Sequence, residues 1–177
     1  MQFISHGAAR EVTGTCHEIR VGDKRILLDC GLFQGKRKEA AEKNAGFSFD
    51  PRKDIDAVIL SHAHMDHAGR LPLLYKKGYQ GAIFCTYATQ DLSEVMLQDA
   101  AYIQEKDEEF MSRHLKNSMV PTTGPLFTQQ DAGECMKLFV GRNYNERFQV
   151  IPGVYCTFLE AGHILGAAML VLEIEEN

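Results

Sequence analysis

Four side chains that can bind a metal ion lie within six residues, in the segment His62-Ala63-His64-Met65-Asp66-His67. Imidazole nitrogens and carboxylate oxygens are the usual protein ligands of catalytic zinc. Side chains two residues apart in an extended segment point to the same side, so we predict that His62 and His64 bind one ion. Asp66 and His67, just beyond the turn, are predicted to face a second ion. This cluster favours a zinc-dependent hydrolase over a surface loop that is rich in histidine by chance.

Two further residues fit the same site. A pair of histidines needs a third protein ligand, and His163 follows a predicted strand in a glycine-rich turn. We therefore predict that His163 binds the ion of His62 and His64, rather than serving only the structure of its turn. Asp29 closes an apolar run, where a carboxylate needs a partner. Because a metal-bound histidine donates its second ring N–H to such a group, we predict that Asp29 orients the histidine loop; a plain turn aspartate is the alternative.

The other histidines are weaker candidates. His6 lies in a loop rich in glycine and alanine and is kept as a weak candidate for lining the site. His17 and His114 are predicted to be ordinary surface or core histidines. The chain contains no GxSxG elbow, Walker loop or GxGxxG motif, so these sequence patterns give no support to a serine hydrolase, a P-loop enzyme or a dinucleotide-binding protein.

The sequence predicts strands and helices that alternate loosely. Apolar runs and alternating patterns predict strands at residues 3–4, 16–21, 25–29, 57–60, 82–85, 147–151, 154–159 and 168–174. Helical spacing of apolar residues predicts helices at residues 69–77, 90–113 and 128–140, the last with a capping box at its start. Residues 36–44 are predicted to be a solvated helix or loop, residues 105–109 an acidic solvated face, and residues 118–127 a loop. The pattern indicates an α/β layered fold in one domain.

Composition limits which partners and which cell compartment are expected for the protein. The 177 residues carry a formal net charge of -5, so the bulk charge predicts no affinity for nucleic acid, although bound cations would still attract phosphate. No apolar run reaches the ~18 residues that cross a membrane, and the N-terminus lacks the pattern of a signal peptide. The five cysteines form no CxxC pair and are predicted to be reduced, mostly buried thiols of a cytoplasmic protein; they are Cys16, Cys30, Cys85, Cys135 and Cys156.

Four segments resemble motifs of one family. Residues 27–31 (LLDCG), 62–69 (HAHMDHAG) and 161–168 (AGHILGAA) resemble the first three motifs of the metallo-β-lactamase fold superfamily. The AGHxLGAA form of the third motif is similar to the β-CASP branch of RNA- and DNA-processing nucleases, as is the loop at residues 7–14 (GAAREVTG). The resemblance implies a four-layer αββα sandwich that is incomplete in this chain, with its first half and the start of its second half.

The resemblance also implies a site and a reaction. His62, His64 and His163 would bind the first zinc ion, and Asp66 and His67 the second. In this family a hydroxide between the two ions attacks a phosphodiester, and Asp66 orients it, so Asp66 is the catalytic residue that the resemblance implies. The implied substrate is RNA, with single-stranded RNA favoured. A homodimer stays open, and no membrane partner is expected.

The resemblance implies that residues 1–177 are the N-terminal part of a metallo-β-lactamase-like domain. The β-CASP cap domain, the C-terminal part of the domain, the carboxylate that bridges the metals and the general acid would lie outside this sequence. We therefore expect the chain by itself to bind at most one zinc ion well and to have little nuclease activity. DNA cleavage, hydrolysis of a lactone or thioester, and a non-catalytic role as an RNA-processing scaffold stay open as alternatives, as does the choice between an endonuclease and an exonuclease.

Overall fold

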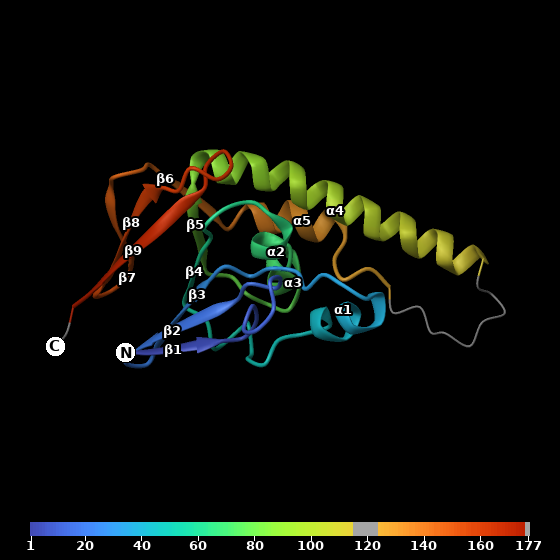
Figure 1. The fold of residues 1–177 in the computed structure, drawn as a ribbon, viewed down its shortest axis with the longest axis horizontal. Helices are drawn as coiled ribbons and strands as arrows, with labels where there is room; N and C mark the ends of the chain where they lie inside the picture. Colours follow the sequence, from blue (N-terminus) through green and yellow to red (C-terminus); the bar gives the residue numbers. More distant parts are fainter. Residues whose placement is uncertain (115–123, 176–177) are drawn as a thin grey trace.

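The computed structural model describes residues 1–114, without the side chain of His114, and residues 124–175. Its described strands form two sheets (Figure 1). The larger sheet has the order β1-β2-β3-β4-β5-β6, with strands Gln2–Ser5, His17–Val21, Lys24–Leu28, Ala57–Ile59, Ala82–Thr86 and Phe139–Arg142. The smaller sheet has the order β7-β8-β9, with strands Arg147–Ile151, Val154–Glu160 and Ala168–Ile174. The helices are α1 Arg37–Asn44, α2 Met65–Ala68, α3 Leu71–Lys76, α4 Tyr87–His114 and α5 Gln129–Met136.

The central strands of the larger sheet run parallel. β3, β4, β5 and β6 pair in parallel, whereas β1, β2 and β3 pair antiparallel. The carboxyl ends of parallel strands meet at one edge of a sheet, which is where ligands bind in open α/β sheets. Asp29 follows β3, residues 60–64 follow β4, and Thr86 ends β5. The topology therefore gathers segments that are far apart in the sequence at the edge where the histidine loop lies.

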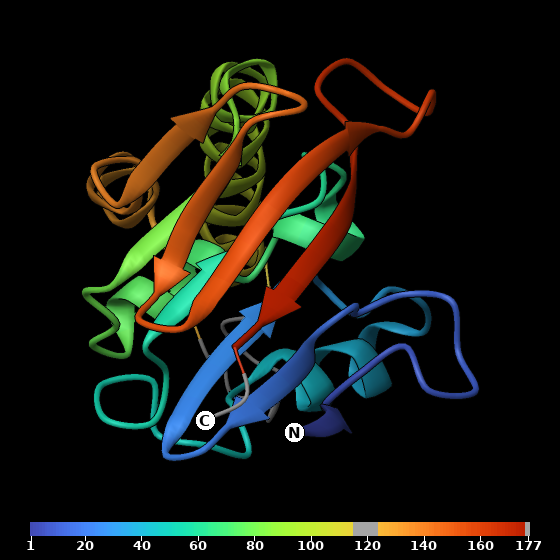
Figure 2. The same ribbon diagram turned by 90° about the vertical axis from the view of Figure 1, so that its left-hand side faces the viewer.

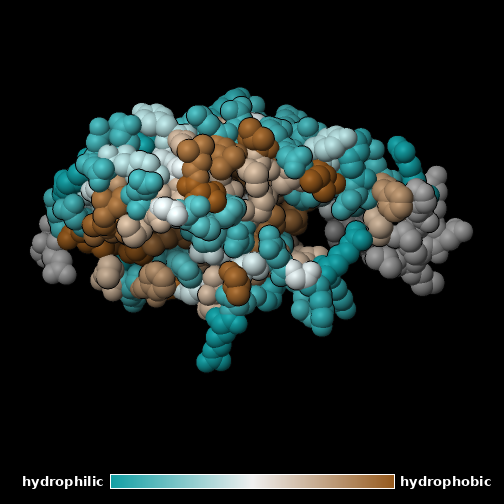
Figure 3. Space-filling view, turned by 45° about the horizontal axis from the view of Figure 1, so that its top comes forward, coloured by the Kyte–Doolittle hydropathy of each residue, from teal (hydrophilic) through white to brown (hydrophobic). Residues whose placement is uncertain are grey.

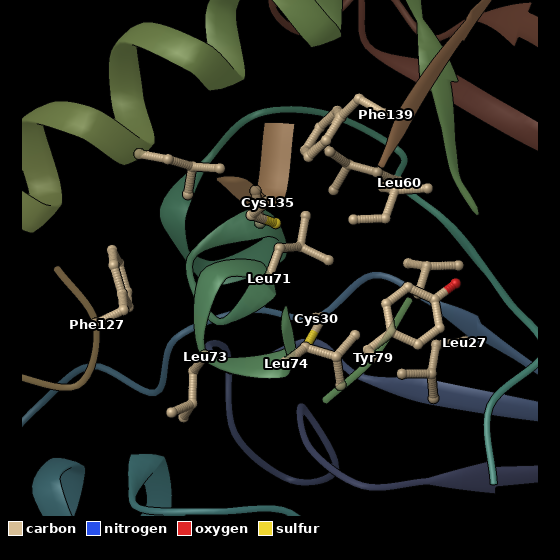
Figure 4. Close-up of a cluster of buried hydrophobic side chains, with 14 of the residues drawn as sticks. Leu27, Cys30, Leu60, Leu71, Leu73, Leu74, Tyr79, Phe127, Cys135 and Phe139 are labelled. Atoms are coloured by element: carbon tan, nitrogen blue, oxygen red, sulfur yellow. The ribbon is translucent and has the colours of Figure 1, made fainter. Parts of the chain in front are cut away.

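Side chains of β4 alternate between two apolar cores. Val58 faces the core under the helices, and Ala57 and Ile59 face the core under the smaller sheet, as expected for a strand that is buried on both faces. Figure 4 shows the first core, in which Leu71 and Leu74 of α3 are buried. Figure 2 looks onto the smaller sheet, which covers the other face of the larger one. The described residues thus form three layers, helices, sheet and sheet, as expected for an incomplete αββα sandwich.

The predicted strands and the helix at residues 90–113 are confirmed, but the C-terminal part of one helix prediction is wrong. The helix predicted at residues 128–140 ends at Met136, and residues 139–142 form β6 instead. Residues of β6 alternate between buried and half-buried, and the strand pairs in parallel with β5. The sheet contact therefore outweighs the apolar spacing that favoured a longer helix. The capping box at the start of α5 is confirmed, because the Thr128 hydroxyl accepts from the amide of Asp131.

Details of the helices differ from the predictions. The single turn α2 lies within the histidine cluster and was not predicted, and α4 begins three residues before residue 90. Asp107 and Glu109 of the acidic segment are exposed as predicted, while Glu105 accepts a hydrogen bond from the amide of Gln129 at 3.0 Å. Residues 118–123 of the predicted loop lie outside the described part of the chain. The face of the molecule that carries α4 mixes hydrophilic and hydrophobic side chains (Figure 3). Tyr87 and Val95 of α4 are exposed.

The structure agrees with the predicted state of the cysteines. All five are buried and free. Burial raises the pKa of Cys135 to about 12, so this thiol stays protonated near neutral pH. Among the described residues, no helix is both long and apolar enough to cross a membrane.

Candidate metal centre

The histidine loop between β4 and α2 is held by backbone hydrogen bonds. His62 and His64 lie in its extended part, and Asp66 and His67 lie in the single turn of α2. Three amides next to β2 and β3 donate to carbonyl oxygens of α2. The pairs are Leu32 N to Met65 O at 2.8 Å, Thr15 N to Asp66 O at 2.9 Å and Cys30 N to His67 O at 2.7 Å. These bonds satisfy backbone carbonyls that so short a helix leaves free, and they fix the loop against the sheet.

Three imidazoles converge at this edge of the sheet. Nδ1 of His64 lies 3.1 Å from Nε2 of His62 and 3.1 Å from Nε2 of His163. One nitrogen of each residue lies within 4.8 Å of the other two. His62 is buried, His64 is half-buried and His163 is exposed. The structure thus brings together the three histidines that were predicted to share the first metal ion, with His163 arriving from the loop between β8 and β9.

Hydrogen bonds determine which ring nitrogen of His62 carries its proton. The Ser61 hydroxyl donates to Asp29 at 2.8 Å, so it accepts from Nδ1 of His62, which lies 2.9 Å away. Nε2 of His62 then carries a lone pair that faces His64. Burial, together with the neighbouring imidazole of His67, lowers the pKa of His62 to about 4, so the ring is neutral near pH 7. A neutral imidazole in this tautomer has the form that binds a metal ion.

Asp29 joins the histidine loop to the end of β3. Its carboxylate accepts hydrogen bonds from the amide and hydroxyl of Ser61, at 2.7 and 2.8 Å, and from Nδ1 of His67, at 2.7 Å. Burial acts to lower the pKa of His67, but the hydrogen bond and charge of Asp29 outweigh it and raise that pKa. Asp29 has a φ of 60°, a conformation that aspartate adopts more readily than most residues. One carboxylate therefore orients His67 directly and His62 through Ser61.

Asp66 and His67 form a second group beside the three imidazoles. Because Nδ1 of His67 is bound to Asp29, its Nε2 faces the Asp66 carboxylate, 3.7 Å from Oδ2. The rings of His62 and His67 have centroids 4.1 Å apart, so the two groups adjoin. This second group offers one carboxylate and one imidazole, fewer than the three protein ligands of a typical catalytic zinc site. A second ion would need ligands beyond this pair.

Ser61 is a functional candidate that the sequence patterns did not single out. It contacts both Asp29 and His62, and its carbonyl oxygen accepts from the amide of Ala168, 2.9 Å away, beyond the loop of His163. The available signal was its position, since it lies between the buried strand β4 and His62. A serine has no intrinsic preference for that role, so the contact with Asp29 was needed to identify it.

The structure places His6 in a separate polar network. Its Nε2 lies 2.7 Å from the buried Glu18 carboxylate, and its Nδ1 lies 2.8 Å from the Ser48 hydroxyl. The three side chains tie the loop after β1 to the segment before β4, away from the three converging imidazoles. His17 lies in β2 opposite β1, as an ordinary half-buried residue. The side chain of His114 lies outside the described residues.

Glu18 is fully buried, and its charge is met by three neighbours. Arg25 donates from Nε at 2.7 Å and from a terminal nitrogen at 3.0 Å, and Arg20 donates to the same carboxylate. Burial acts to raise the pKa of Glu18, but hydrogen bonds from Arg25, Arg20 and His6 outweigh it and lower that pKa from 4.5 to about 2. This network holds β2 and β3 together and ties them to His6, in the loop that follows β1.

The variant Glu18→Gln is expected to lower the free energy of unfolding by about 3 kcal/mol at pH 7, because it leaves two arginines without their buried charge. Stability from a lowered pKa is complete above the unfolded value and is lost as the pH falls toward the folded value. The difference from the unmodified chain should therefore shrink to about 2 kcal/mol at pH 3.5 and to less than about 0.5 kcal/mol at pH 2. Urea unfolding across this range measures it. Glu173→Gln, which removes an exposed partner of Arg147, is the matched control and should cost less than about 1 kcal/mol. A constant difference from pH 7 to pH 3 would contradict the role of the Glu18 charge.

Comparison with known proteins shows which superfamily the chain resembles. A sequence profile described as the metallo-beta-lactamase superfamily matches residues 9–83, which include the histidine loop, and Ribonuclease TTHA0252 from Thermus thermophilus is 39% identical over 99% of this chain. Over residues 9–83 the chain is therefore similar to the metallo-beta-lactamase superfamily. Its fold is also that of a metallo-beta-lactamase HARLDQ motif mutant from Cronobacter sakazakii, with a TM-score of 0.51 and 16% identity over 95% of this chain and 54% of the other. This similarity implies metal binding, and the three converging histidines are a group of described residues suited to it.

The relatives are considerably longer than this chain. The chain covers 36% of the length of Ribonuclease TTHA0252. Transcription termination factor FttA from Methanocaldococcus jannaschii is 34% identical over 97% of this chain and 25% of its own length. Cleavage and polyadenylation specificity factor 73 from Drosophila melanogaster is 31% identical over 98% of this chain and 23% of its own length. These relatives confirm the predicted resemblance to the β-CASP branch, and the chain spans roughly a quarter to a third of their length.

Proposed function

We propose that this chain carries the first metal site of a zinc-dependent phosphodiesterase that cleaves RNA. The main support is the convergence of His62, His64 and His163, whose ring nitrogens form two contacts of 3.1 Å. Nδ1 of His64 carries either one proton or one lone pair, so it cannot serve both contacts equally, whereas a cation bound among the three nitrogens can accept a lone pair from each. The RNA substrate of the proposal comes from relatives that are named as a ribonuclease and as a cleavage and polyadenylation factor.

Each residue of the site has a role in this proposal. His62, His64 and His163 bind the first ion, and His67 and Asp66 are ligands of a second. Bound zinc lowers the pKa of water and offsets the charge of a phosphodiester. Asp66, with its carboxylate beside Nε2 of His67, accepts a hydrogen bond from the attacking water and so orients it. Asp29 keeps Nε2 of His67 free by accepting the proton of Nδ1, and Ser61 does the same for His62.

In this proposal the complete activity belongs to a protein of the relatives' length that contains this chain. Residues 1–177 are its N-terminal part, and the cap domain and the rest of the catalytic domain lie elsewhere in that protein. The support is the unequal ligand count of the two groups, with three imidazoles in the first but one imidazole and one carboxylate in the second. This chain by itself is therefore expected to bind one zinc ion tightly and to cleave RNA poorly.

Zinc counting and RNA cleavage test the two parts of this proposal separately. Metal analysis of the purified chain after dialysis is expected to find one zinc ion per chain. A chain without zinc would overturn the metal site, and two tightly bound ions per chain would overturn the unequal ligand count. Cleavage of labelled RNA is expected from a protein of the relatives' length and not from this chain. A longer protein that binds zinc and leaves RNA intact would overturn the assigned reaction.

Further parts of the proposal concern the form of the nucleic-acid substrate, the location of the protein and its oligomeric state. We assign single-stranded RNA as substrate and a cytoplasmic location, and association as a homodimer stays open. Comparing single-stranded RNA, duplex RNA and single-stranded DNA in the cleavage assay tests the first of these. Hydrolysis of a lactone or thioester by the longer protein, with no cleavage of nucleic acid, would favour another hydrolase of the superfamily. Binding of RNA without any cleavage would favour a scaffold.

A further inference from the structure

The loop that carries His163 is exposed where it reaches the metal centre and buried where it joins β9. Ala161, Gly162 and His163 are exposed, while Gly166 and Ala167 are buried. Two of these residues have positive φ angles, 64° at Gly162 and 82° at Gly166. A loop with such glycines has many accessible conformations, so the position of His163 depends on how the buried end of the loop is fixed.

Two threonine hydroxyls converge on one carbonyl oxygen at that buried end. Oγ1 of Thr86 donates to the Gly166 carbonyl oxygen at 2.7 Å, and Oγ1 of Thr89 donates to the same oxygen at 2.8 Å. Both threonines are at most 3% exposed. A carbonyl oxygen has two lone pairs, so these hydroxyls saturate it. The pair, which we call the threonine clamp, belongs to the end of β5 and the first turn of α4.

The clamp requires glycine at position 166. A Cβ built on Gly166 would lie 2.4 Å from the amide nitrogen of Thr89 and 2.8 Å from Oγ1 of Thr86. The first of these is a backbone atom at the start of α4 and cannot rotate away. Close approach of the loop to the helix and the positive φ of Gly166 thus go together with the double hydrogen bond.

The N-terminus of α4 needs only one of the two threonine hydroxyls for its cap. Thr86 lies just before the helix, and its hydroxyl accepts from the Thr89 amide at 3.1 Å, as a capping residue does. Thr86 alone therefore caps the helix. The Thr89 hydroxyl adds nothing to the cap, and its partner is the Gly166 carbonyl. This second hydroxyl is therefore best explained by the loop rather than by the helix.

Further hydrogen bonds connect Gly166 to the part of the loop that carries His163. The Ala167 amide donates to the carbonyl oxygen of Ile164 at 2.9 Å, and the Ala161 amide donates to that of Ala167 at 3.1 Å. The Tyr144 hydroxyl donates to the same Ala167 carbonyl at 2.9 Å. These bonds close the loop on both sides of His163, so a shift at Gly166 displaces the imidazole.

We propose that Thr86 and Thr89 are positioning residues that hold His163 in place for the metal ion of His62 and His64. This inference rests on the proposed metal site. A ligand that is already in place loses less conformational freedom on binding, and partners behind a metal ligand typically change metal affinity by about 10–100-fold. The clamp acts through the backbone of the loop, and neither threonine is a ligand itself.

The variant Thr89→Val keeps the shape of the side chain and removes the donor to Gly166. It is expected to weaken zinc binding by about 10-fold in competition with a chromophoric chelator. Thr89→Ser restores a hydroxyl and is expected to bind within about 2-fold of the unmodified chain. Thr157→Val in β8 makes the same chemical change outside the clamp and is expected to have no effect. Circular dichroism and thermal unfolding establish that each variant is folded.

A double-mutant cycle separates positioning from general damage to the fold. In a chain that already carries His163→Ala, Thr89→Val has no ligand left to position. Its effect on zinc affinity should then fall below about 2-fold. An equal loss with and without His163 would show that the valine acts through the fold as a whole, and no loss in the unmodified background would also overturn the proposal.

Hydrogen exchange distinguishes failure of this inference from failure of the proposed function. In the metal-free chain, Thr89→Val is expected to accelerate exchange of the Ala167 amide, whereas Thr157→Val is not. Unchanged exchange together with unchanged zinc affinity would reject the clamp while leaving the metal site standing. A chain that binds no zinc at all would reject both, whatever its exchange rates.

Discussion

The variant Gly31→Ala is expected to lower the free energy of unfolding by at least ~4 kcal/mol and to disrupt the metal centre. A Cβ on Gly31 would lie 1.6 Å from the carbonyl oxygen of Asp66 and 2.6 Å from the amide nitrogen of His67. Both are backbone atoms of α2, and the amides of Cys30 and Leu32 hold α2 on either side of the contact. Neither atom can rotate away, so the two segments would have to separate. Asp66 and His67 would then move with them.

Urea unfolding and zinc affinity measure this prediction. Gly46→Ala is the matched control, because a Cβ there would meet nothing within 4 Å and the position does not have a positive φ. It should change the free energy of unfolding by less than about 1 kcal/mol. If both variants unfolded at the same urea concentration, the close approach between Gly31 and α2 would be wrong. Loss of stability without loss of zinc affinity would show that the histidines are positioned independently of Gly31.

The grouping of His62 and His64 could be predicted because short-range spacing determines it. His62 and His64 follow β4 with the two-residue period of an extended chain, and the carboxyl end of a parallel strand is where a site is expected. Asp29 could be predicted for a related reason, since a carboxylate at the end of a buried strand needs a partner. The structure gives it two, Ser61 and His67. These predictions depended on single segments and on general preferences of side chains.

The supporting residues could not be predicted because their roles depend on contacts across the chain. Gly31 and Thr89 are common residue types in ordinary local settings. Their importance comes from α2 and from the His163 loop, which lie far away in the sequence. The error at residues 137–140 has the same origin, because β6 forms by pairing with β5 rather than by its own pattern. Single-sequence patterns therefore indicate which side chains gather at this edge of the sheet better than they indicate the scaffold that holds them.

The variant His64→Ala is expected to lower the zinc affinity of this chain by roughly 100- to 1,000-fold, whereas His67→Ala should change it by less than about 10-fold. Apparent free energies of zinc binding are ~10–16 kcal/mol for sites with four ligands, so losing one ligand costs about 2.5–4 kcal/mol. His64 faces both other histidines, with Nδ1 3.1 Å from each. His67 turns Nδ1 toward Asp29 and Nε2 toward Asp66, outside that group of three.

The ranking of these two variants decides between one site and two. If the three imidazoles form a site of their own, removing His67 leaves the three ligands and changes the affinity only through the loop. If all five predicted ligands share a single ion in this chain, the two variants should lose affinity by similar factors. Chelator competition provides both constants, and thermal unfolding without metal shows whether His67→Ala has loosened Asp29 and the loop. Equal losses in folded variants would reject the separation of a three-histidine site from the Asp66 and His67 pair, and with it the proposal that Asp66 and His67 are ligands of a second ion.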